Sequence, residues 1–332
     1  MLQRLLVALS ACGVAMAVAS VPAHAQADPL ASWIDGATKA RIVAFVKAAT
    51  EPGGKDFVPA ADRIAVFDND GTLWSEQPMY FQLAFAIDRA RAMVAKNPEL
   101  AKKPAMKAAA AGDMKALAAT GEKGLVELVM ATHAGNTADE FAQIVRDWLA
   151  TARHPKLNRP YTELVYQPML ELLAYLRANG FQTWIVSGGG VEFLRVFAEE
   201  RYGVPPQQVV GSSVKTKYEV RGGKPAIVRL PQIDFIDDKA GKPVGIHKFI
   251  GKRPIAAFGN SDGDFEMLEW VTSASGARLG LIVHHDDASR EFAYDRKSHI
   301  GRLDRALDEA GPRGWTVVSM KDDWKVIFAP PR

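Results

Sequence analysis

Two aspartates stand two residues apart directly after a short run of apolar residues. Residues 64–67 read Ile-Ala-Val-Phe, and Asp68-Asn69-Asp70-Gly71-Thr72 follows at once. If the apolar run is a strand, the alternation of side chains points Asp68 and Asp70 the same way. One carboxylate can then act as a nucleophile while the other donates and accepts protons. The pair therefore suits hydrolysis through a covalent intermediate, with Asp68 as nucleophile and Asp70 as general acid and base.

Three further polar clusters occur where an apolar run ends or a helix begins. They are Ser187-Gly188-Gly189-Gly190, Lys242, and the run from Asn260 to Asp264. Glycine lets backbone N–H groups approach an anion, so Ser187 and the amides of Gly188, Gly189 and Gly190 are suited to hold a phosphate group. A lysine ammonium can bind the phosphate and the nucleophile together.

Lys248 is the alternative to Lys242. Lys242 precedes Pro243, a residue type favoured at the first position of a helix, which places its ammonium at the start of the helix expected over residues 243–250. Lys248 lies inside that helix, where a lysine usually faces solvent. The position favours Lys242 as the phosphate-binding lysine, and the sequence alone leaves Lys248 open.

These clusters need a scaffold that brings them together. From Pro168 onward helical and strand patterns alternate, with strands expected at 183–186, 209–210, 255–258, 279–283 and 315–319 and a polar hairpin over 215–240. Such alternation predicts an α/β fold, a parallel sheet with helices on both faces. The carboxyl ends of parallel strands open on one crevice, so the four clusters are expected to meet there.

Residues 77–165 have a different pattern. They are helical in periodicity and contain no convincing strand, and Thr137 and Glu140 form a capping box before an apolar helical stripe. We expect a separate helical module inserted after the first strand. An amphipathic helix with Ile42, Phe45 and Val46 on its apolar face precedes the core.

The order and chemistry of the four clusters resemble the haloacid dehalogenase (HAD) superfamily. Its motifs are matched by Phe67-Asp68-Asn69-Asp70-Gly71-Thr72-Leu73, by Val186-Ser187-Gly188-Gly189, by a helix-opening lysine and by Gly259-Asn260-Ser261-x-x-Asp264, over about residues 63–290. We therefore expect an N-terminal helix and the first part of a Rossmann-like core at 26–76, a helical cap at 77–165 and the remainder of the core at 166–332. The second acid of the first motif and the helical insertion look most like the phosphoserine-phosphatase branch with a C1-type cap.

The resemblance also implies a Mg²⁺ ion. Its ligands would be an Asp68 oxygen, the backbone carbonyl of Asp70 and the side chain of Asn260, with Asp264 close by. Asn260 stands where the family more often has an acid, so we expect weaker Mg²⁺ binding and tighter binding after Asn260→Asp. Without a metal, the loop from Asn260 to Asp264 would read as a helix N-cap with an acidic first turn.

Substrate recognition is less specified. Thr72, Gly188 and Gly189 are candidate substrate contacts, and Glu76 is placed to face a substrate amine. Trp74 and Tyr80 have two interpretations: they line a site for a cationic head group, or they pack the hinge beside the first motif.

Composition sets the remaining limits. The chain has 332 residues, 48% of them hydrophobic, and a formal net charge of +3 that is not concentrated in any run. This composition is that of a globular protein, and the charge pattern does not indicate binding to nucleic acid or to an anionic membrane. A small phosphomonoester is the expected partner, and no pattern indicates an oligomeric state.

Residues 1–25 have the pattern of an export signal. Arg4 precedes an uncharged run over 5–21, and Ala23-His24-Ala25 is a cleavage site before Gln26. We expect removal after Ala25, a periplasmic or secreted protein, and no stable membrane insertion. An uncleaved anchor is disfavoured because the run is shorter than the ~20 residues a spanning helix needs. Cys12, the single cysteine, also lies in a lipoprotein-like box, but processing there would leave the apolar residues 13–21 after the lipid, which disfavours lipidation. Loss of Cys12 with the signal would leave no cysteine for a disulfide.

The sequence therefore predicts a Mg²⁺-dependent phosphatase that forms an aspartyl-phosphate. Two alternatives stay open. One is a phosphotransferase, and the other is a periplasmic binding protein that keeps the HAD fold with little turnover, which only the neutral Asn260 suggests.

Overall fold

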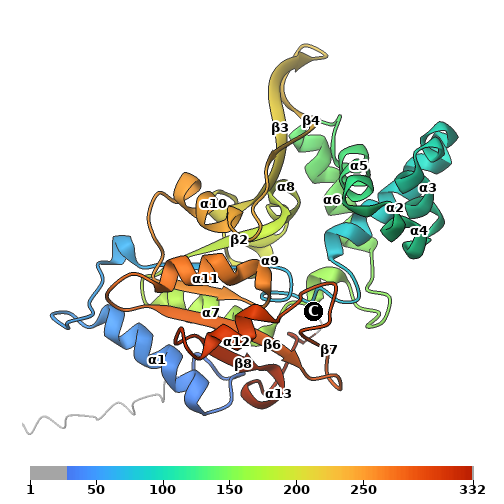
Figure 1. Cartoon of the computed structure of the whole chain (residues 1–332). Helices are drawn as coiled ribbons and strands as arrows, with labels where there is room; N and C mark the ends of the chain where they lie inside the picture. The colour runs from blue at the N-terminus through green and yellow to red at the C-terminus, as the bar shows by residue number, and fades with distance from the viewer. Residues whose placement is uncertain (1–27, 331–332) are drawn as a thin grey trace, which may run out of the picture.

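A computed structural model of the chain describes residues 28–330. The expected signal segment, residues 1–25, lies outside the described residues. Figure 1 shows a central sheet with helices packed around it, a group of helices to one side and a long hairpin that projects from the sheet.

The sheet has eight strands in the order β4-β3-β2-β1-β5-β6-β7, with β8 beside β6. β1 pairs in parallel with β2 and β5, and the parallel pairing continues to β3, β6 and β8, whereas β4 and β7 are antiparallel edge additions. The strands are β1 (Ile64–Phe67), β2 (Gln182–Gly190), β3 (Val209–Arg221), β4 (Lys224–Phe235), β5 (Ala256–Gly259), β6 (Leu279–Asp286), β7 (Ala293–Tyr294) and β8 (Thr316–Ser319). The predicted α/β class with a parallel sheet is confirmed.

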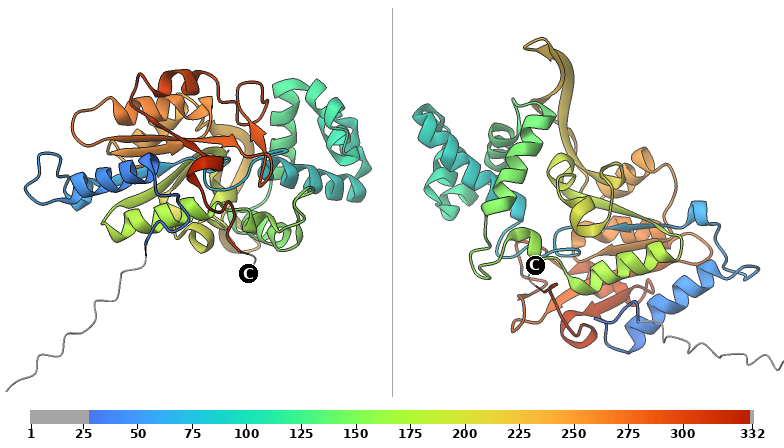
Figure 2. Two further views of the ribbon diagram at one scale, coloured as in Figure 1. Left: turned by 90° about the horizontal axis from the view of Figure 1, so that it is seen from below. Right: turned by 180° about the vertical axis from the view of Figure 1, so that it is seen from behind.

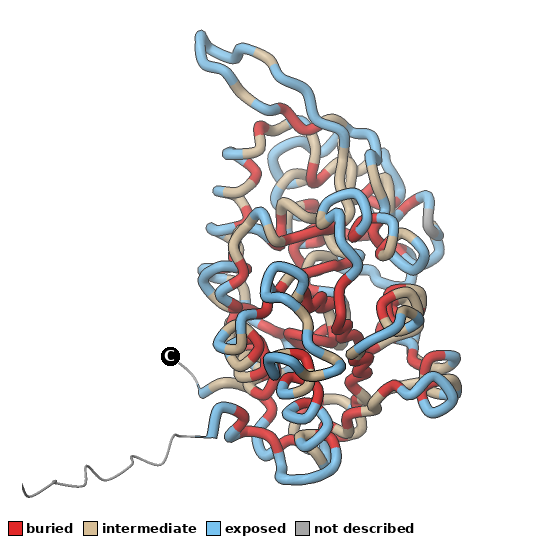
Figure 3. Tube along the Cα trace, turned by 90° about the vertical axis from the view of Figure 1, so that its left-hand side faces the viewer, coloured by how far each residue is buried: buried red, intermediate tan, exposed pale blue. Residues whose placement is uncertain are grey.

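Helices cover both faces of the sheet, as Figure 2 shows. Ala65 and Phe67 of β1 pack in a cluster with α1 (Ala37–Thr50) and α7 (Gln167–Ala178) on one face. Ile64 and Val66 pack in a second cluster with the helices of the other face, α10 (Gly241–Phe249), α11 (Phe265–Thr272) and α12 (Arg305–Ala310). All four β1 residues are buried, which explains why the central strand is a continuous apolar run rather than an alternating one. Figure 3 shows the buried residues gathered inside the trace.

The remaining helical segments are short. They are α8 (Val191–Leu194), α9 (Ala198–Tyr202) and α13 (Met320–Asp323), with 3₁₀ turns at Ala60–Asp62, Pro98–Lys102, Tyr161–Glu163, Pro206–Gln208 and Asp262–Asp264. Within residues 28–330, no helix has the length and apolarity needed to cross a membrane.

Five helices between β1 and α7 form the cap: α2 (Phe81–Lys96), α3 (Pro104–Ala111), α4 (Met114–Ala119), α5 (Gly121–His133) and α6 (Ala138–Thr151). Across residues 77–165 the described backbone contains no strand beyond isolated bridges. The cap has a small apolar cluster of its own, which includes Ala90, Met106 and Leu117. The capping box is present, because Thr137 accepts a bond from the Glu140 backbone N–H and Glu140 accepts one from that of Thr137.

The hairpin is a continuation of the core sheet. Val209 and Val210 pair with β2, and the same strand then runs on to Arg221, where it turns back as β4. We expected a short strand and a separate hairpin, and the structure joins them. The loop after α5 pairs with β4, since the N–H of Arg229 donates to the Asn136 carbonyl at 3.0 Å. The cap and the hairpin are thus joined by backbone bonds.

Element ends differ from expectation at two places that matter for the site. α10 begins at Gly241, not at residue 243, so Lys242 lies in its first turn. β2 extends to Gly190, so Ser187 and the glycines belong to the strand end. The short β7 was not expected.

Candidate active site

A cavity of about 560 Å³ opens at the carboxyl ends of the central strands, between the sheet, the cap and the hairpin. It brings together candidates from four separate stretches of sequence. Its lining includes Asp68, Asp70, Glu76, Gly188, Gly189 and Lys242. The other candidates, Thr72, Ser187, Asn260 and Asp264, are buried next to this lining.

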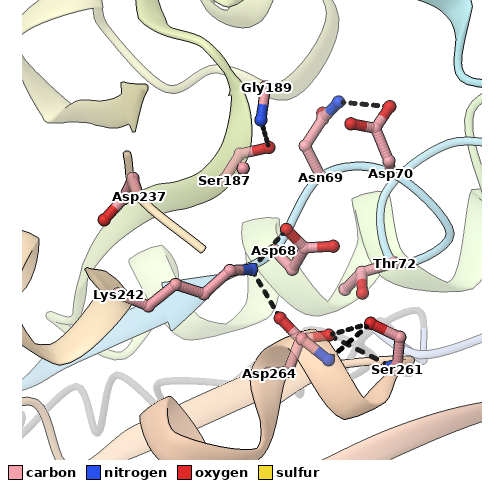
Figure 4. Close-up of polar contacts among 12 residues, drawn as sticks. Asp68, Asn69, Asp70, Thr72, Ser187, Gly189, Asp237, Lys242, Ser261 and Asp264 are labelled. Carbon is pink, nitrogen blue, oxygen red and sulfur yellow. Dashed lines mark hydrogen bonds and ion pairs between the residues drawn. The ribbon is translucent and has the colours of Figure 1, made fainter. Parts of the chain in front are cut away.

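Lys242 is the centre of a buried charge cluster (Figure 4). Its Nζ donates to Asp68 Oδ1 at 2.6 Å and to Asp264 Oδ1 at 2.5 Å, and all three side chains are at most 9% exposed. Burial by itself would lower the pKa of Lys242, but the charges of Asp264 and Asp68 raise it. The lysine therefore stays protonated and holds the expected nucleophile in place.

Lys248 lies elsewhere. Its Nζ is 5.6 Å from the centre of the Phe235 ring and 5.0 Å from that of Phe249. It is absent from the cavity lining, whereas Lys242 contacts Asp68.

The acidic groups outnumber the ammonium that faces them. Burial raises the pKa of Asp68 well above its ordinary value, and the charges of Asp264 and Asp70 raise it further. Lys242 lowers this pKa, and a second cation beside Asp68 would lower it further. The oxygen-only donors on offer suit Mg²⁺, which prefers carboxylate and carbonyl oxygens.

The residues therefore fit the implied Mg²⁺. Asp68, the Asp70 carbonyl and Asn260 would hold it, with Asp264 beside them. Among residues 28–330, no group of three or more His, Cys, Asp or Glu side chains is arranged to hold a metal. The implied set differs from such a group, because it uses an amide and a main-chain oxygen.

Asp70 is held by Trp74. The indole Nε1 donates to Asp70 Oδ1 at 2.7 Å. The ring of Trp74 is buried and lies 4.6 Å from that of Phe81 and 4.5 Å from that of Phe197. Burial raises the pKa of Asp70 to about 6. A carboxyl with a pKa near neutrality is suited to give and take protons. Of the two interpretations of Trp74, its position matches packing of the hinge.

Glu76, which lines the cavity, forms a hydrogen-bonded pair with the buried Asn260. Asn260 Nδ2 donates to Glu76 Oε1 at 2.8 Å, and the Tyr294 hydroxyl donates to the same oxygen at 2.8 Å. Thr72 Oγ1 donates to Asn260 Oδ1 at 3.2 Å. A Cβ on Gly71, which has φ +76°, would lie 2.0 Å from Asn260 Nδ2, so only glycine fits there. The Asn260 amide is therefore fixed, with its oxygen toward Thr72 and its nitrogen toward Glu76.

The bond between Glu76 and Asn260 determines what the Asn260→Asp variant can do. An aspartate at 260 would lose the N–H donor and face the Glu76 carboxyl, a loss of about 1–3 kcal/mol for a buried polar group left without its partner. The double variant Glu76→Gln/Asn260→Asp restores the bond with donor and acceptor exchanged. We expect the double variant to bind Mg²⁺ more tightly than wild type, measured by calorimetric titration, and to unfold at a higher temperature than Asn260→Asp.

Glu76→Gln is the control, because it changes the partner and keeps the amide at 260. If Asn260→Asp alone matched the double variant in affinity and stability, the Glu76 contact would have no part in setting the site.

The glycine loop, Ser187 to Gly190, is hydrogen-bonded to the cap. The Gly189 N–H donates to Ser187 Oγ at 3.1 Å, and the Gly190 N–H donates to Gln82 Oε1 at 2.7 Å. We expected all three glycine amides to face a phosphate group, but the cap side chain Gln82 takes that of Gly190. Gly188 and Gly189 line the cavity, so the loop keeps its position beside Asp68 and Asp70.

A network behind the first motif supports its backbone. His285 Nε2 lies 2.8 Å from the Gly71 carbonyl and its Nδ1 lies 3.3 Å from Glu291 Oε2. Ser75 donates to Glu291 Oε1 at 2.5 Å. These side chains are buried and tie the loop after β1 to the end of β6.

Asp237 is a buried carboxyl that we did not identify from the sequence. Neither of its oxygens has a hydrogen-bond partner among the described residues, and burial raises its pKa to about 7 while Lys242 acts in the opposite direction. A Cβ on Gly245 would lie 2.3 Å from Asp237 Oδ1, so this carboxyl packs against α10 where that helix lacks a side chain.

Three polar residues that line the cavity on the side of the cap and the hairpin, the upper wall, were not predicted from the sequence: Gln82, His133 and Arg229. Gln82 Nε2 lies 3.0 Å from His133 Nε2, and Arg229 pairs with Glu192 at 2.5 Å. No local pattern marks them, because they come from the cap and the hairpin and meet only in the folded chain.

Comparison with known proteins identifies the fold and the family. A protein of unknown function from Anaerococcus prevotii DSM 20548 is 18% identical, with a TM-score of 0.50 over 75% of this chain and 86% of its own. A protein of unknown function from Bordetella pertussis Tohama I is 17% identical, with a TM-score of 0.47 over 77% and 97%. A phosphoserine phosphohydrolase-like protein from Francisella tularensis subsp. tularensis SCHU S4 is 17% identical, with a TM-score of 0.39 over 75% and 98%. A search of curated sequences finds no significant match.

The family model of haloacid dehalogenase-like hydrolases matches residues 65–269. This range begins in β1 and ends in α11, so it contains all four polar clusters and the cap. The matched range covers more than half of the chain, and the chain therefore belongs to the family of haloacid dehalogenase-like hydrolases.

Proposed function

We propose that this hydrolase is a Mg²⁺-dependent phosphomonoesterase that works through an aspartyl-phosphate on Asp68. One observation carries the proposal: two carboxylates, Asp68 and Asp70, share a cavity with a buried lysine whose Nζ is 2.6 Å from Asp68 Oδ1. A nucleophile, a proton carrier and a cation for the phosphate oxygens are the groups that phosphoryl transfer requires.

The reaction has two displacements. In the first, an Asp68 oxygen forms a bond to phosphorus, the bond from phosphorus to the ester oxygen breaks, and Asp70 gives its proton to the departing alkoxide. In the second, Asp70 takes a proton from water, the water oxygen bonds to phosphorus, and the bond from phosphorus to Asp68 breaks. The products are the alcohol and inorganic phosphate. Lys242 neutralises charge on the phosphate oxygens, and bound Mg²⁺ supplies further charge neutralisation.

Hydrolysis of p-nitrophenyl phosphate tests the proposal. We expect turnover with Mg²⁺, loss of activity in EDTA, and recovery with Mg²⁺ better than with Ca²⁺, whose larger and looser ligand shell would misplace the phosphate. Rates are to be compared at equal ionic strength in the three conditions. Full turnover in EDTA would contradict the metal dependence. No turnover of any phosphomonoester with Mg²⁺ would contradict the phosphatase and favour a binding protein.

The proposal includes location. The charged start, apolar run and cleavage site of residues 1–25 support export, and the substrate would then be a phosphomonoester outside the cytoplasm.

A further inference from the structure

The cavity extends well beyond the phosphate site. At about 560 Å³ it lies within the range of about 300–1,000 Å³ typical of sites for drug-sized ligands. Asp68, Asp70, Lys242 and the glycine loop occupy only its floor. The remaining space must hold the alcohol part of the ester.

The walls above the floor are apolar on two sides. On the cap side, α5 contributes Leu125, Val126, Val129 and Met130, which lie at helical spacing and face the cavity. On the other side, Ile233 and Phe235 line the cavity from β4. These two residues are two positions apart on a strand and so share one face.

Two polar side chains of the wall above the floor, Gln82 and His133, are already hydrogen-bonded. Gln82 bonds the Gly190 amide and lies 3.0 Å from His133, whose other ring nitrogen lies 2.8 Å from Thr132 Oγ1. Arg229 is opposed by Glu192, and its guanidinium carbon lies 3.6 Å from the centre of the Phe141 ring, although its Nη1 has no hydrogen-bond partner among the described residues. A zwitterion such as phosphoserine would also place charge against the apolar side chains of α5 and β4, and unpaired charges are costly to bury.

The apolar side chains also remain partly open to the cavity. Leu125 is 38% exposed and Ile233 is 40% exposed, although both line the space between cap and hairpin. An apolar ligand there would remove this surface from water, which is favourable at about 25 cal/mol per Å².

We infer that the preferred substrates are phosphomonoesters of apolar alcohols, alkyl or aryl, rather than of small zwitterionic alcohols such as serine. This inference rests on the proposed phosphatase function and names its substrate class. The phosphate occupies the floor beside Asp68, and the apolar group lies between α5 and β4.

The test is a series of alkyl phosphates from methyl to hexyl, with phosphoserine, assayed with Mg²⁺. Burial of a methylene is worth about 0.8 kcal/mol, so we expect kcat/KM to rise up to about fourfold for each added carbon, and hexyl phosphate to exceed phosphoserine. Equal values across the series, or phosphoserine as the best substrate, would overturn the inference while leaving the phosphatase intact.

The affinity of non-hydrolysable analogues tests the inference even if the protein turns over no ester. Alkylphosphonates are not hydrolysed, and their affinity, measured by calorimetry, should rise with chain length in the same way. Affinity independent of length would overturn the inference even if no ester were hydrolysed, whereas a rise without hydrolysis would contradict only the phosphatase.

Matched variants locate the apolar site. Ile233→Thr should reduce the ratio of hexyl to methyl kcat/KM by about threefold to tenfold, because a wall side chain loses apolar surface. Ile227→Thr is the control: it lies on the same strand, is 46% exposed and is absent from the lining. Leu125→Gln against Met114→Gln, at 38% and 39% exposed, makes the same comparison in the cap. Equal ratios in a variant and its control would place the alcohol elsewhere.

Discussion

Asp68→Asn is expected to abolish turnover and the phosphoenzyme together. The amide is a poor nucleophile, and Asp264, which also contacts Lys242, is bonded to the backbone N–H groups of Asn260 and Ser261 rather than directed at a leaving group. Removal of the nucleophile of a covalent hydrolase lowers kcat on the order of 10⁶-fold. The measurement is p-nitrophenyl phosphate hydrolysis with Mg²⁺, together with intact-mass analysis after an acid quench.

Asp62→Asn is the matched control. Asp62 precedes β1, pairs with Lys252 at 2.6 Å and is 51% exposed at its side chain, so its loss should leave turnover unchanged. Normal turnover in Asp68→Asn, or phosphate mapped to Ser187 or to a histidine in wild type, would overturn the assignment of the nucleophile.

Asp70→Asn should slow both displacements but leave the first one the faster with an activated aryl ester. General acid and base help is typically worth ~10²–10⁴-fold. The nitrophenolate leaves with little need of a proton, whereas hydrolysis of the intermediate still needs a base for water. Phosphate should therefore accumulate on Asp68, which intact-mass analysis and peptide mapping can detect.

The structure makes this variant conservative. An asparagine at 70 keeps an oxygen that can accept from Trp74 Nε1, now 2.7 Å from Asp70 Oδ1. The position of the side chain should survive while its proton chemistry does not. An Asp70→Asn enzyme that turned over without any delay in the second step would remove Asp70 from the acid and base role.

The sequence predicts the floor of the site better than its walls. Ile64 to Phe67 is a fully buried apolar run, and Asp68 and Asp70 follow it, because a central parallel strand leaves this local pattern. Lys242 could be favoured from its place near a helix start, although α10 begins one residue before it. Asn260 and Asp264 stand out because a polar run follows a buried strand, β5.

The walls depend on contacts between distant segments. Gln82 meets Gly190, and Asn136 meets Arg229, across 108 and 93 positions of sequence. No periodicity within either segment encodes such a meeting. The continuity of β3 was missed for a similar reason: its first residues are buried between neighbouring strands and its later ones face solvent, so its composition changes along one strand.

The pairing of Asn136 with Arg229 has a consequence for binding thermodynamics. The cap joins the core through its own chain connections, and it also joins the hairpin, whose strand β3 is hydrogen-bonded into the sheet. The cap is therefore attached on both sides of the cavity, to the core on one side and to the hairpin on the other. Because the cap and the hairpin are hydrogen-bonded to each other without a ligand, binding should lose less conformational entropy in ordering them than it would for a cap held by its chain connections alone. Walls that keep their spacing select alcohols by how well the apolar part fits between them. Breaking the bonds between the cap and the hairpin should therefore reduce the difference in kcat/KM between alkyl phosphates before it reduces the rate itself.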